Sequence, residues 1–393
     1  MQKKISIFSF FSGIGILDLA FEKNGYNIVF VNEYDNLFIE SYRYARMQMN
    51  LRAPIYGYRN DSAERYARRR GKKNLLALIA QEREKGNLVG FIGGPPCPDF
   101  SVAGKNAGVD GENGRLTKIY FDIICRCHPD FFLFENVKGL VKTEKHRAFY
   151  KEMMMKVQAN DYVIAENVLN ALAYGVPQFR ERVFMVGIHK KIYQNEPNTL
   201  IFKWDKHALF NTENVLTRTW PKEREFATDS SYVFPAKGIL KKLTVEYWFH
   251  KNDVENHPNG NDIFQVKKGR NKIATIAEGD TSGKSFKRLH RWRFSPTAAY
   301  GHNEVHLHPY KERRISVAAG GRRIRSPLNF TARLSRRLSE MNGQRLKPGS
   351  ETISKFPVAS AIFHGRSVPE GAKIHWAHSS SRPKNGRLQI VGE

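Results

Sequence analysis

Three scarcities limit what this chain of 393 residues can be. It has only three cysteines, Cys97, Cys125 and Cys127, too few for a disulfide framework, and their spacing does not match a zinc-binding pattern. No apolar run reaches the roughly 18 residues of a membrane span. The basic and apolar N-terminus lacks a small-residue cleavage site, so we expect no signal peptide. We therefore expect a cytoplasmic protein with no metal and no membrane partner.

Acidic residues are also scarce. The chain has 38 Asp and Glu against 64 Lys and Arg, which gives a formal net charge of +26. Such charge opposes compaction unless a polyanion lies nearby, so nucleic acid is the leading partner. An anionic membrane surface and a merely basic soluble protein are the alternatives. An apolar fraction of 41% and an aromatic fraction of 12% exclude a disordered chain.

The first 190 residues alternate short apolar runs with stretches of helical periodicity. We expect strands at 4–11, 27–32, 87–94, 129–136 and 166–171. We expect helices at 16–21, 36–49, 63–84, 115–126 and 143–158. This alternation predicts an α/β fold with a mostly parallel sheet and helices on both faces.

Between about 190 and 290 helical periodicity fades, and aromatic and basic residues interleave, as in Phe202-Lys-Trp204 and His290-Arg-Trp292-Arg293. We expect a separate small module there, with irregular β structure and long loops. Beyond 310 the chain is rich in Arg, Ser and Gly, and no internal repeat occurs.

A glycine turn, Phe11-Ser-Gly-Ile-Gly15, follows the first predicted strand. Such a turn lets a nucleoside ligand approach the backbone at the start of a helix, and Glu33 after the second strand could bind a ribose hydroxyl pair. A purely structural turn explains the pattern equally well. The third glycine of a dinucleotide fingerprint is missing, which disfavours NAD and leaves another adenosine cofactor.

A second motif, Gly93-Gly-Pro-Pro-Cys97-Pro-Asp-Phe-Ser101, is more specific. Two glycines and two prolines after a strand make a stiff, exposed loop that displays the Cys97 thiol, a nucleophile if its pKa is depressed. The alternative, a buried structural cysteine, fits a proline-rich loop poorly.

Two further motifs follow. Glu135 lies at a predicted strand end, where a carboxylate usually faces a site, although a surface acid is the alternative. Gln178, Arg180 and Arg182 are spaced two apart, so an extended strand would turn all three to one face and suit an anionic substrate. A solvated edge strand is the alternative.

Taken in order, these motifs resemble the DNA (cytosine-5) methyltransferases of bacterial restriction–modification systems. The segments Ser295–Pro309 and Arg313–Val317 resemble the region that follows the family's target-recognition module, so the resemblance covers residues 1 to about 318. It implies a Rossmann-like S-adenosylmethionine-dependent methyltransferase sheet plus a smaller, irregular β-rich target-recognition domain. The implied divisions are a catalytic domain, a target-recognition domain, a return segment and a basic C-terminal region, at 1–190, 191–290, 291–318 and 319–393.

The resemblance also implies a mechanism. The Cys97 thiolate would attack C6 of a cytosine flipped out of double-stranded DNA, and the methyl group of S-adenosyl-L-methionine would then transfer to C5. Glu135 would hydrogen-bond N3 and the exocyclic amine, while Arg182 and Arg180 would stabilise developing charge. Loss of the C5 proton would then expel Cys97.

The remaining implied contacts fall into two sets. The cofactor side comprises Phe11, Ser12, Gly13, Gly15, Glu33, Tyr34, Asp61 and Pro96. The substrate side comprises Ser101, Asn136, Val137 and Gln178. Asp61 could instead cap the helix that begins at 63. The implied protein is a bacterial monomer that protects host DNA from a cognate restriction endonuclease, which it need not contact.

The chain departs from the family pattern after about residue 318. Ala318-Ala-Gly-Gly stands where a family helix should begin, and Gly365-Arg366 resembles the last motif only faintly. We interpret this region as degenerate or frame-disrupted; a basic DNA-gripping tail is the alternative. The alternative functions are an RNA cytosine-5 methyltransferase and a catalytically weakened DNA-binding remnant.

Overall fold

The computed structural model describes residues 4–96, 112–193, 200–229, 234, 238–257, 260–266, 269–297 and 305–316. Backbone packing divides the chain into two units, 1–350 and 351–393, and every described residue lies in the first. Cys97, Ser101 and the region after 318 therefore lie outside the described residues. None of the helices in the described ranges has the length and apolar character that a membrane crossing requires.

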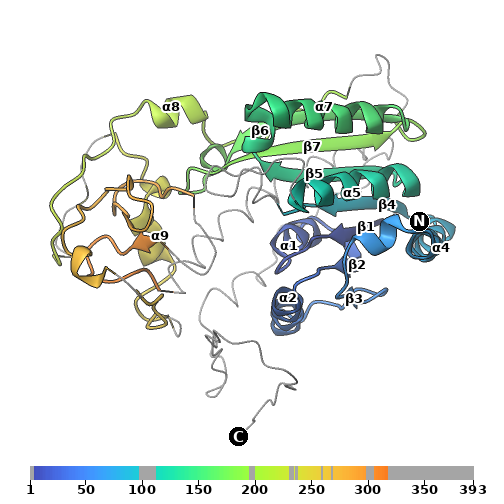
Figure 1. Cartoon of the computed structure of the whole chain (residues 1–393). Helices are drawn as coiled ribbons and strands as arrows, with labels where there is room; N and C mark the ends of the chain where they lie inside the picture. The colour runs from blue at the N-terminus through green and yellow to red at the C-terminus, as the bar shows by residue number, and fades with distance from the viewer. Residues whose placement is uncertain are drawn as a thin grey trace, which may run out of the picture. The chain divides into compact units, whose positions relative to one another are not determined.

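A seven-stranded sheet forms the core, in the order β3-β2-β1-β4-β5-β7-β6. The strands are β1 Ile5–Phe10, β2 Asn27–Asn32, β3 Tyr58–Arg59, β4 Leu88–Gly93, β5 Phe131–Val137, β6 Tyr162–Asn170 and β7 Glu181–His189. Strands β1 to β5 pair in parallel, and only β7 runs antiparallel to its neighbours β5 and β6. Figure 1 shows this twisted sheet between its helices, and it confirms the α/β prediction.

Helices cover both faces of the sheet. They are α1 Ile16–Glu22, α2 Asn36–Gln48, α3 Glu64–Ala67, α4 Arg69–Glu84, α5 Glu112–Cys127, α6 Gly139–Lys142 and α7 Glu144–Gln158. One core cluster joins alternate strand residues such as Phe91 to Ile79 of α4, Phe121 of α5 and Met153 of α7. The opposite-facing residues, such as Ile92, share a second cluster with α1 and α2. The two-period alternation along buried strands explains this division.

The expected single helix at 63–84 is two helices. The chain is extended at Arg68, which separates α3 from α4. Gly71 then lies so close to α3 that an added Cβ would be 2.0 Å from the carbonyl oxygen of Arg65. The helical periodicity continues through this break, so periodicity alone could not reveal it.

The stretch from Gln178 to Arg182 is not one strand, which corrects the prediction that all three functional side chains share a strand face. Strand β7 begins only at Glu181. Gln178 instead makes an isolated bridge with Ser295, and the amide of Phe179 donates to the Ser295 carbonyl. Contacts with a distant segment therefore decide where the strand begins.

The described residues from 200 to 316 contain little β structure. They form α8 Thr212–Leu216, α9 Val245–Lys251, the 3-10 turns η4 Lys241–Leu243 and η5 Arg270–Lys272, and the paired two-residue strands β8 Lys287–Arg288 and β9 His306–Leu307. The β-rich expectation thus fails for these residues. Backbone carbonyls here accept hydrogen bonds from buried side chains instead of from neighbouring strands. Arg288, for example, donates to the carbonyls of Ile273 and Ile276. The domain boundaries remain predictions.

Candidate active site

The glycine turn after β1 is held in a demanding conformation. Phe11 has a positive φ of 52°, a conformation that disfavours residues with a Cβ, and Gly15 has a φ of 78°. The amide of Ser12 donates to the carbonyl of Asn32, and that of Gly15 to Ser12. These bonds fix the turn at the carboxyl ends of β1 and β2, the edge where ligands bind in open α/β sheets.

Glu33 shapes the same turn. One of its carboxylate oxygens accepts from the Gly13 amide at 2.7 Å, and the other accepts from the Asp35 amide at 2.8 Å. Asp35 in turn caps α2 through the amides of Leu37 and Phe38. A carboxylate has about four acceptor positions, so Glu33 keeps capacity for a ligand hydroxyl.

A buried polar network anchors this turn from behind, and the sequence did not reveal it. Asp18 accepts from the hydroxyls of Ser9 and Tyr42 at 2.8 and 2.9 Å. Arg46 donates to the Gly15 carbonyl at 2.9 Å and pairs with Glu22 at 2.9 Å. The spacing of Tyr42 and Arg46 by one helical turn was the only available signal.

Burial raises the pKa values of the two acids in this network. The pKa of Asp18 is raised despite the nearby Arg46 guanidinium, and the pKa of Glu22 rises to about 7. The network therefore places two carboxyl groups next to one guanidinium group away from water. Removing one partner there would lower the free energy of unfolding substantially.

The turn has features that fit a nucleoside cofactor. The Ser12 hydroxyl oxygen is buried and has no hydrogen-bond partner among the described residues, so it is available to a ligand. Nothing lies within 4 Å of the position that a Cβ on Gly13 would take. Tyr34 is 76% exposed beside this turn and offers a free aromatic face.

Asp61 follows β3 and is tied to the end of β2. It accepts hydrogen bonds from the Asn32 amide and the Tyr66 hydroxyl, both at 2.9 Å, and it pairs with Arg65. The amide of Glu64 at the start of α3 bonds to Ser62 instead. The helix-capping alternative for Asp61 is therefore wrong.

The described base of the cysteine-bearing loop lies next to β5. Strands β4 and β5 pair Gly93 with Phe134, and an added Cβ on Gly94 would lie 3.1 Å from Glu135 Oε2. Asn136 donates its side-chain amide to the Pro95 carbonyl at 3.5 Å. Pro96, the last described residue before Cys97, is exposed.

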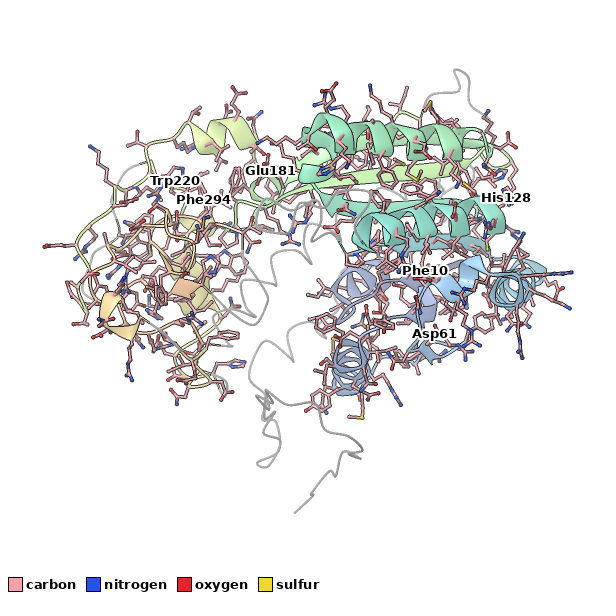
Figure 2. All side chains as sticks on the ribbon, viewed as in Figure 1. Phe10, Asp61, His128, Glu181, Trp220 and Phe294 are labelled. Carbon is pink, nitrogen blue, oxygen red and sulfur yellow. The ribbon has the colours of Figure 1, made fainter. Side chains whose placement is uncertain are left out.

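Glu135 and Arg182 form the central pair of the site. Their register on β5 and β7 brings Arg182 Nε to 3.1 Å from Glu135 Oε1, with side-chain exposures of 16% and 26%. Val137 faces Arg182 directly across the two strands. Glu135 is also close to Gly94, so carboxylate, guanidinium and loop base converge at one edge of the sheet. Figure 2 shows Glu181, the residue before Arg182, at this edge.

The other two members of the third motif are placed differently. Gln178 is buried, and its side-chain nitrogen has no partner among the described residues. Arg180 precedes β7 and its carbonyl accepts from Ala171. The structure therefore brings Arg182 to Glu135 directly and places Gln178 in the contact with Ser295.

The two described cysteines are unsuited to nucleophilic chemistry. Both are free and buried on α5. Burial raises the pKa of Cys125 to about 11 and that of Cys127 to about 12, so both thiols stay protonated near neutral pH. No group of three or more His, Cys, Asp or Glu among the described residues is arranged to hold a metal ion.

Together, the fold and site define an α/β enzyme with a nucleoside-type turn and a carboxylate–guanidinium pair at one sheet edge. A family model described as C-5 cytosine-specific DNA methylase matches residues 5–347, which extends beyond the break in pattern near residue 318. The chain belongs to this family and is a DNA cytosine-5 methyltransferase of the type II restriction–modification kind.

Individual relatives agree. The chain is 50% identical over 317 residues to the type II methyltransferase M.NmeDI of Neisseria meningitidis serogroup C, covering 81% of this chain and 74% of that protein. It is 35% identical over 188 residues to M.FnuDI of Fusobacterium nucleatum, covering 48% of each. A putative DNA modification methyltransferase encoded within a prophage of E. coli has a similar fold, with a TM-score of 0.54 at 20% identity, covering 86% of this chain and 99% of that one.

Proposed function

We propose that this enzyme transfers the methyl group of S-adenosyl-L-methionine to C5 of a cytosine flipped out of a specific double-stranded DNA sequence. The observation that carries the proposal is the Glu135–Arg182 pair beside the base of the Cys97 loop. A flipped pyrimidine needs a hydrogen-bonding carboxyl, a cation and a nucleophile within reach of one ring.

The roles follow from chemistry. Cytosine C5 is a poor nucleophile until Cys97 adds to C6, which turns the ring into an enamine-like species. Glu135 would bind N3 and the exocyclic amine, and Arg182 would stabilise the negative charge that develops on the ring. Arg180 would assist Arg182 in this role. The substrate side is assigned to Ser101, Asn136, Val137 and Gln178. Cys97 is the favoured nucleophile because the other two thiols are buried with raised pKa values.

The cofactor would lie along the glycine turn. The free Ser12 hydroxyl, the open space at Gly13 and the remaining acceptor capacity of Glu33 support this placement, with Tyr34 and Asp61 on the adenosine side. When bound, S-adenosylmethionine supplies an electrophilic methyl group. Phe11, Gly15 and Pro96 would shape the walls of this site.

The region from 191 to 290 would read the DNA sequence. Lys251 lies over the Trp248 ring at 4.9 Å and the Tyr247 ring at 5.7 Å, so a cation stacks on two aromatic rings of α9. These residues line a pocket of about 380 Å³. Lys and Arg side chains here would bind phosphates, while others read base edges. The protein would work as a cytoplasmic monomer and protect host DNA from a cognate restriction endonuclease.

The direct test is methyl transfer from tritiated S-adenosylmethionine to plasmid DNA by the wild type and by Cys97→Ser. We expect Cys97→Ser to lose transfer while it keeps DNA binding in a gel-shift assay. A matched control, Cys125→Ser, removes a buried thiol of α5, and we expect it to keep turnover if it folds. Turnover by Cys97→Ser would overturn the proposal.

A further inference from the structure

A strongly basic surface lies on α3 and the start of α4, far along the chain from the region proposed to read DNA. We define this basic surface by its residues Arg65, Arg68, Arg69, Arg70, Lys72 and Lys73. All are exposed except Lys72, which is half-buried. No Asp or Glu occurs between Glu64 and Glu82 in the sequence.

Local carboxylates neutralise only part of this charge. Arg65 pairs with Asp61 at 3.1 Å and Arg68 with Glu64 at 3.6 Å, and because both arginine side chains are at least 60% exposed, these pairs contribute little stability. Glu64 is also shared with Arg115 of α5. Arg69, Arg70, Lys72 and Lys73 have no ion pair within the described ranges.

The arrangement also opposes helix stability. The first turn of α4 contains Arg69 and Arg70 and no acidic residue, although the positive end of a helix dipole favours acids there. The adjacent positive charges of Arg69 and Arg70 also repel each other. The structure therefore gives this cluster no stabilising role, and only an external anion would relieve its repulsion.

The basic surface is distinct from the site at Glu135. Lys72 lies close enough to Cys127 to lower the pKa of its thiol, although burial outweighs that effect. Cys127 ends α5 just before β5 begins, whereas Glu135 lies near the carboxyl end of β5. Figure 2 shows His128, next to Cys127, toward the opposite end of the strands from Glu181.

We propose that this basic surface is a second DNA-binding site, which grips the phosphate backbone outside the segment held at Glu135. Guanidinium groups bind phosphate oxygens in bidentate fashion, and several of them on one surface suit a repeating phosphate chain. A membrane-binding surface would also expose large apolar side chains. The described residues between Ile55 and Met155 expose none, which favours DNA. This second-site proposal rests on the proposed function in one respect, that the partner of the protein is DNA.

The test compares Arg69→Gln/Arg70→Gln with the charge-matched control Lys151→Gln/Lys190→Gln, whose lysines are exposed elsewhere. Binding of the full chain to a duplex of about 200 base pairs and to one of about 20 is measured over a salt series. Each lost phosphate contact lowers the slope of log K against log salt by about 0.9. We expect a slope smaller by up to about 2 on the long duplex, an unchanged slope on the short one, and no change in the control.

Thermal melting separates binding from folding. Removing repulsive charge should leave the melting temperature of Arg69→Gln/Arg70→Gln unchanged or higher, whereas a structural role would lower it. An unchanged slope on the long duplex, an equal loss on both duplexes, or a lower melting temperature would overturn the proposal. The proposal would also be overturned if Arg69→Gln/Arg70→Gln lost binding to phosphatidylserine vesicles but kept the DNA binding of the wild type. None of these readouts needs catalysis, so a failure of methyl transfer would leave this test intact.

Discussion

At the scale of single residues, the site depends on Glu135 being held between Arg182 and the loop that leads to Cys97. Arg182 Nε lies 3.1 Å from the Glu135 carboxylate, and Gly94 lies close on the other side. Any bulkier residue at 94 would press on this carboxylate. The position of Glu135 is therefore fixed by its two neighbouring strands, as a group that must meet a substrate ring requires.

Glu135→Gln should lower the rate of methyl transfer by about 10²- to 10⁴-fold, because an amide cannot supply the proton relay of a carboxyl group. Affinity for S-adenosylmethionine should stay unchanged, since Glu135 is not among the residues of the glycine turn. Single-turnover kinetics and calorimetry measure the two quantities. Glu144→Gln, at an exposed position of α7, is the matched control, and equal rates for both variants would contradict the assignment.

The sequence predicted site residues that local sequence context identifies. It did not predict contacts between residues that are distant along the chain. Glu33 and Glu135 were predictable because each follows an apolar run at a strand end. The contact of Arg46 with the Gly15 carbonyl was not, because it joins α2 to the residue that precedes α1. The three-residue alignment of Gln178, Arg180 and Arg182 was wrong, because Ser295 holds Gln178 outside β7.

At the scale of elements, the glycine turn depends on how closely α2 approaches the start of α1. An added Cβ on Gly15 would lie 2.2 Å from the Tyr42 ring, which no small adjustment relieves. Tyr42 in turn donates to the buried Asp18. Gly15 is therefore required by packing as well as by its positive φ.

Gly15→Ala should destabilise the fold by several kcal/mol, because it combines a positive φ with a clash in a buried network. Gly25→Ala is the control: Gly25 has a φ of 83° but nothing within 4 Å of its added Cβ, so it should cost only about 1 kcal/mol. Urea unfolding compares the two. Equal losses of stability in Gly15→Ala and Gly25→Ala would contradict the account that the close contact with Tyr42 makes Gly15 necessary.

At the scale of the whole molecule, the catalytic sheet and the region from 200 to 316 are stabilised in different ways. The sheet has two apolar clusters, one on each face. The second region has a small apolar core and depends on buried polar groups, such as Arg291 in a two-bond pair with Glu278 at 2.9 Å. Apolar periodicity therefore predicted the sheet well, but it could not predict a region whose interior is polar.

This polar interior predicts acid sensitivity. Burial lowers the pKa values of His290 and His308 to about 4, and for His308 this outweighs the attraction of Glu255. In the unfolded chain both titrate near 6.5, so the unfolded state binds more protons between pH 6.5 and 4. As pH falls below 6.5, the two histidines should lower the free energy of unfolding by up to about 1.4 kcal/mol per pH unit each. Glu22, whose pKa is raised to about 7 in the folded state, opposes this loss between about pH 7 and 4.5.

Urea unfolding at pH 7.5 and at pH 5.5 measures this effect. His308→Asn should be less stable at pH 7.5 but should show a smaller loss between the two values. The control His250→Gln changes a histidine whose side chain is 78% exposed, and it should keep the wild-type loss. A loss between the two pH values that is equal in His308→Asn and in the wild type would contradict the assignment.

The most direct measurement for the whole account is covalent trapping on DNA. Duplexes that carry 5-fluorocytosine in place of cytosine, in a fragment methylated by the wild type, are incubated with S-adenosylmethionine and separated under denaturing conditions. Because fluorine cannot leave as a proton does, the account predicts a stable protein–DNA adduct whose linked peptide contains Cys97. A folded wild-type protein that methylates ordinary DNA but forms no such adduct, or an adduct through another residue, would contradict it.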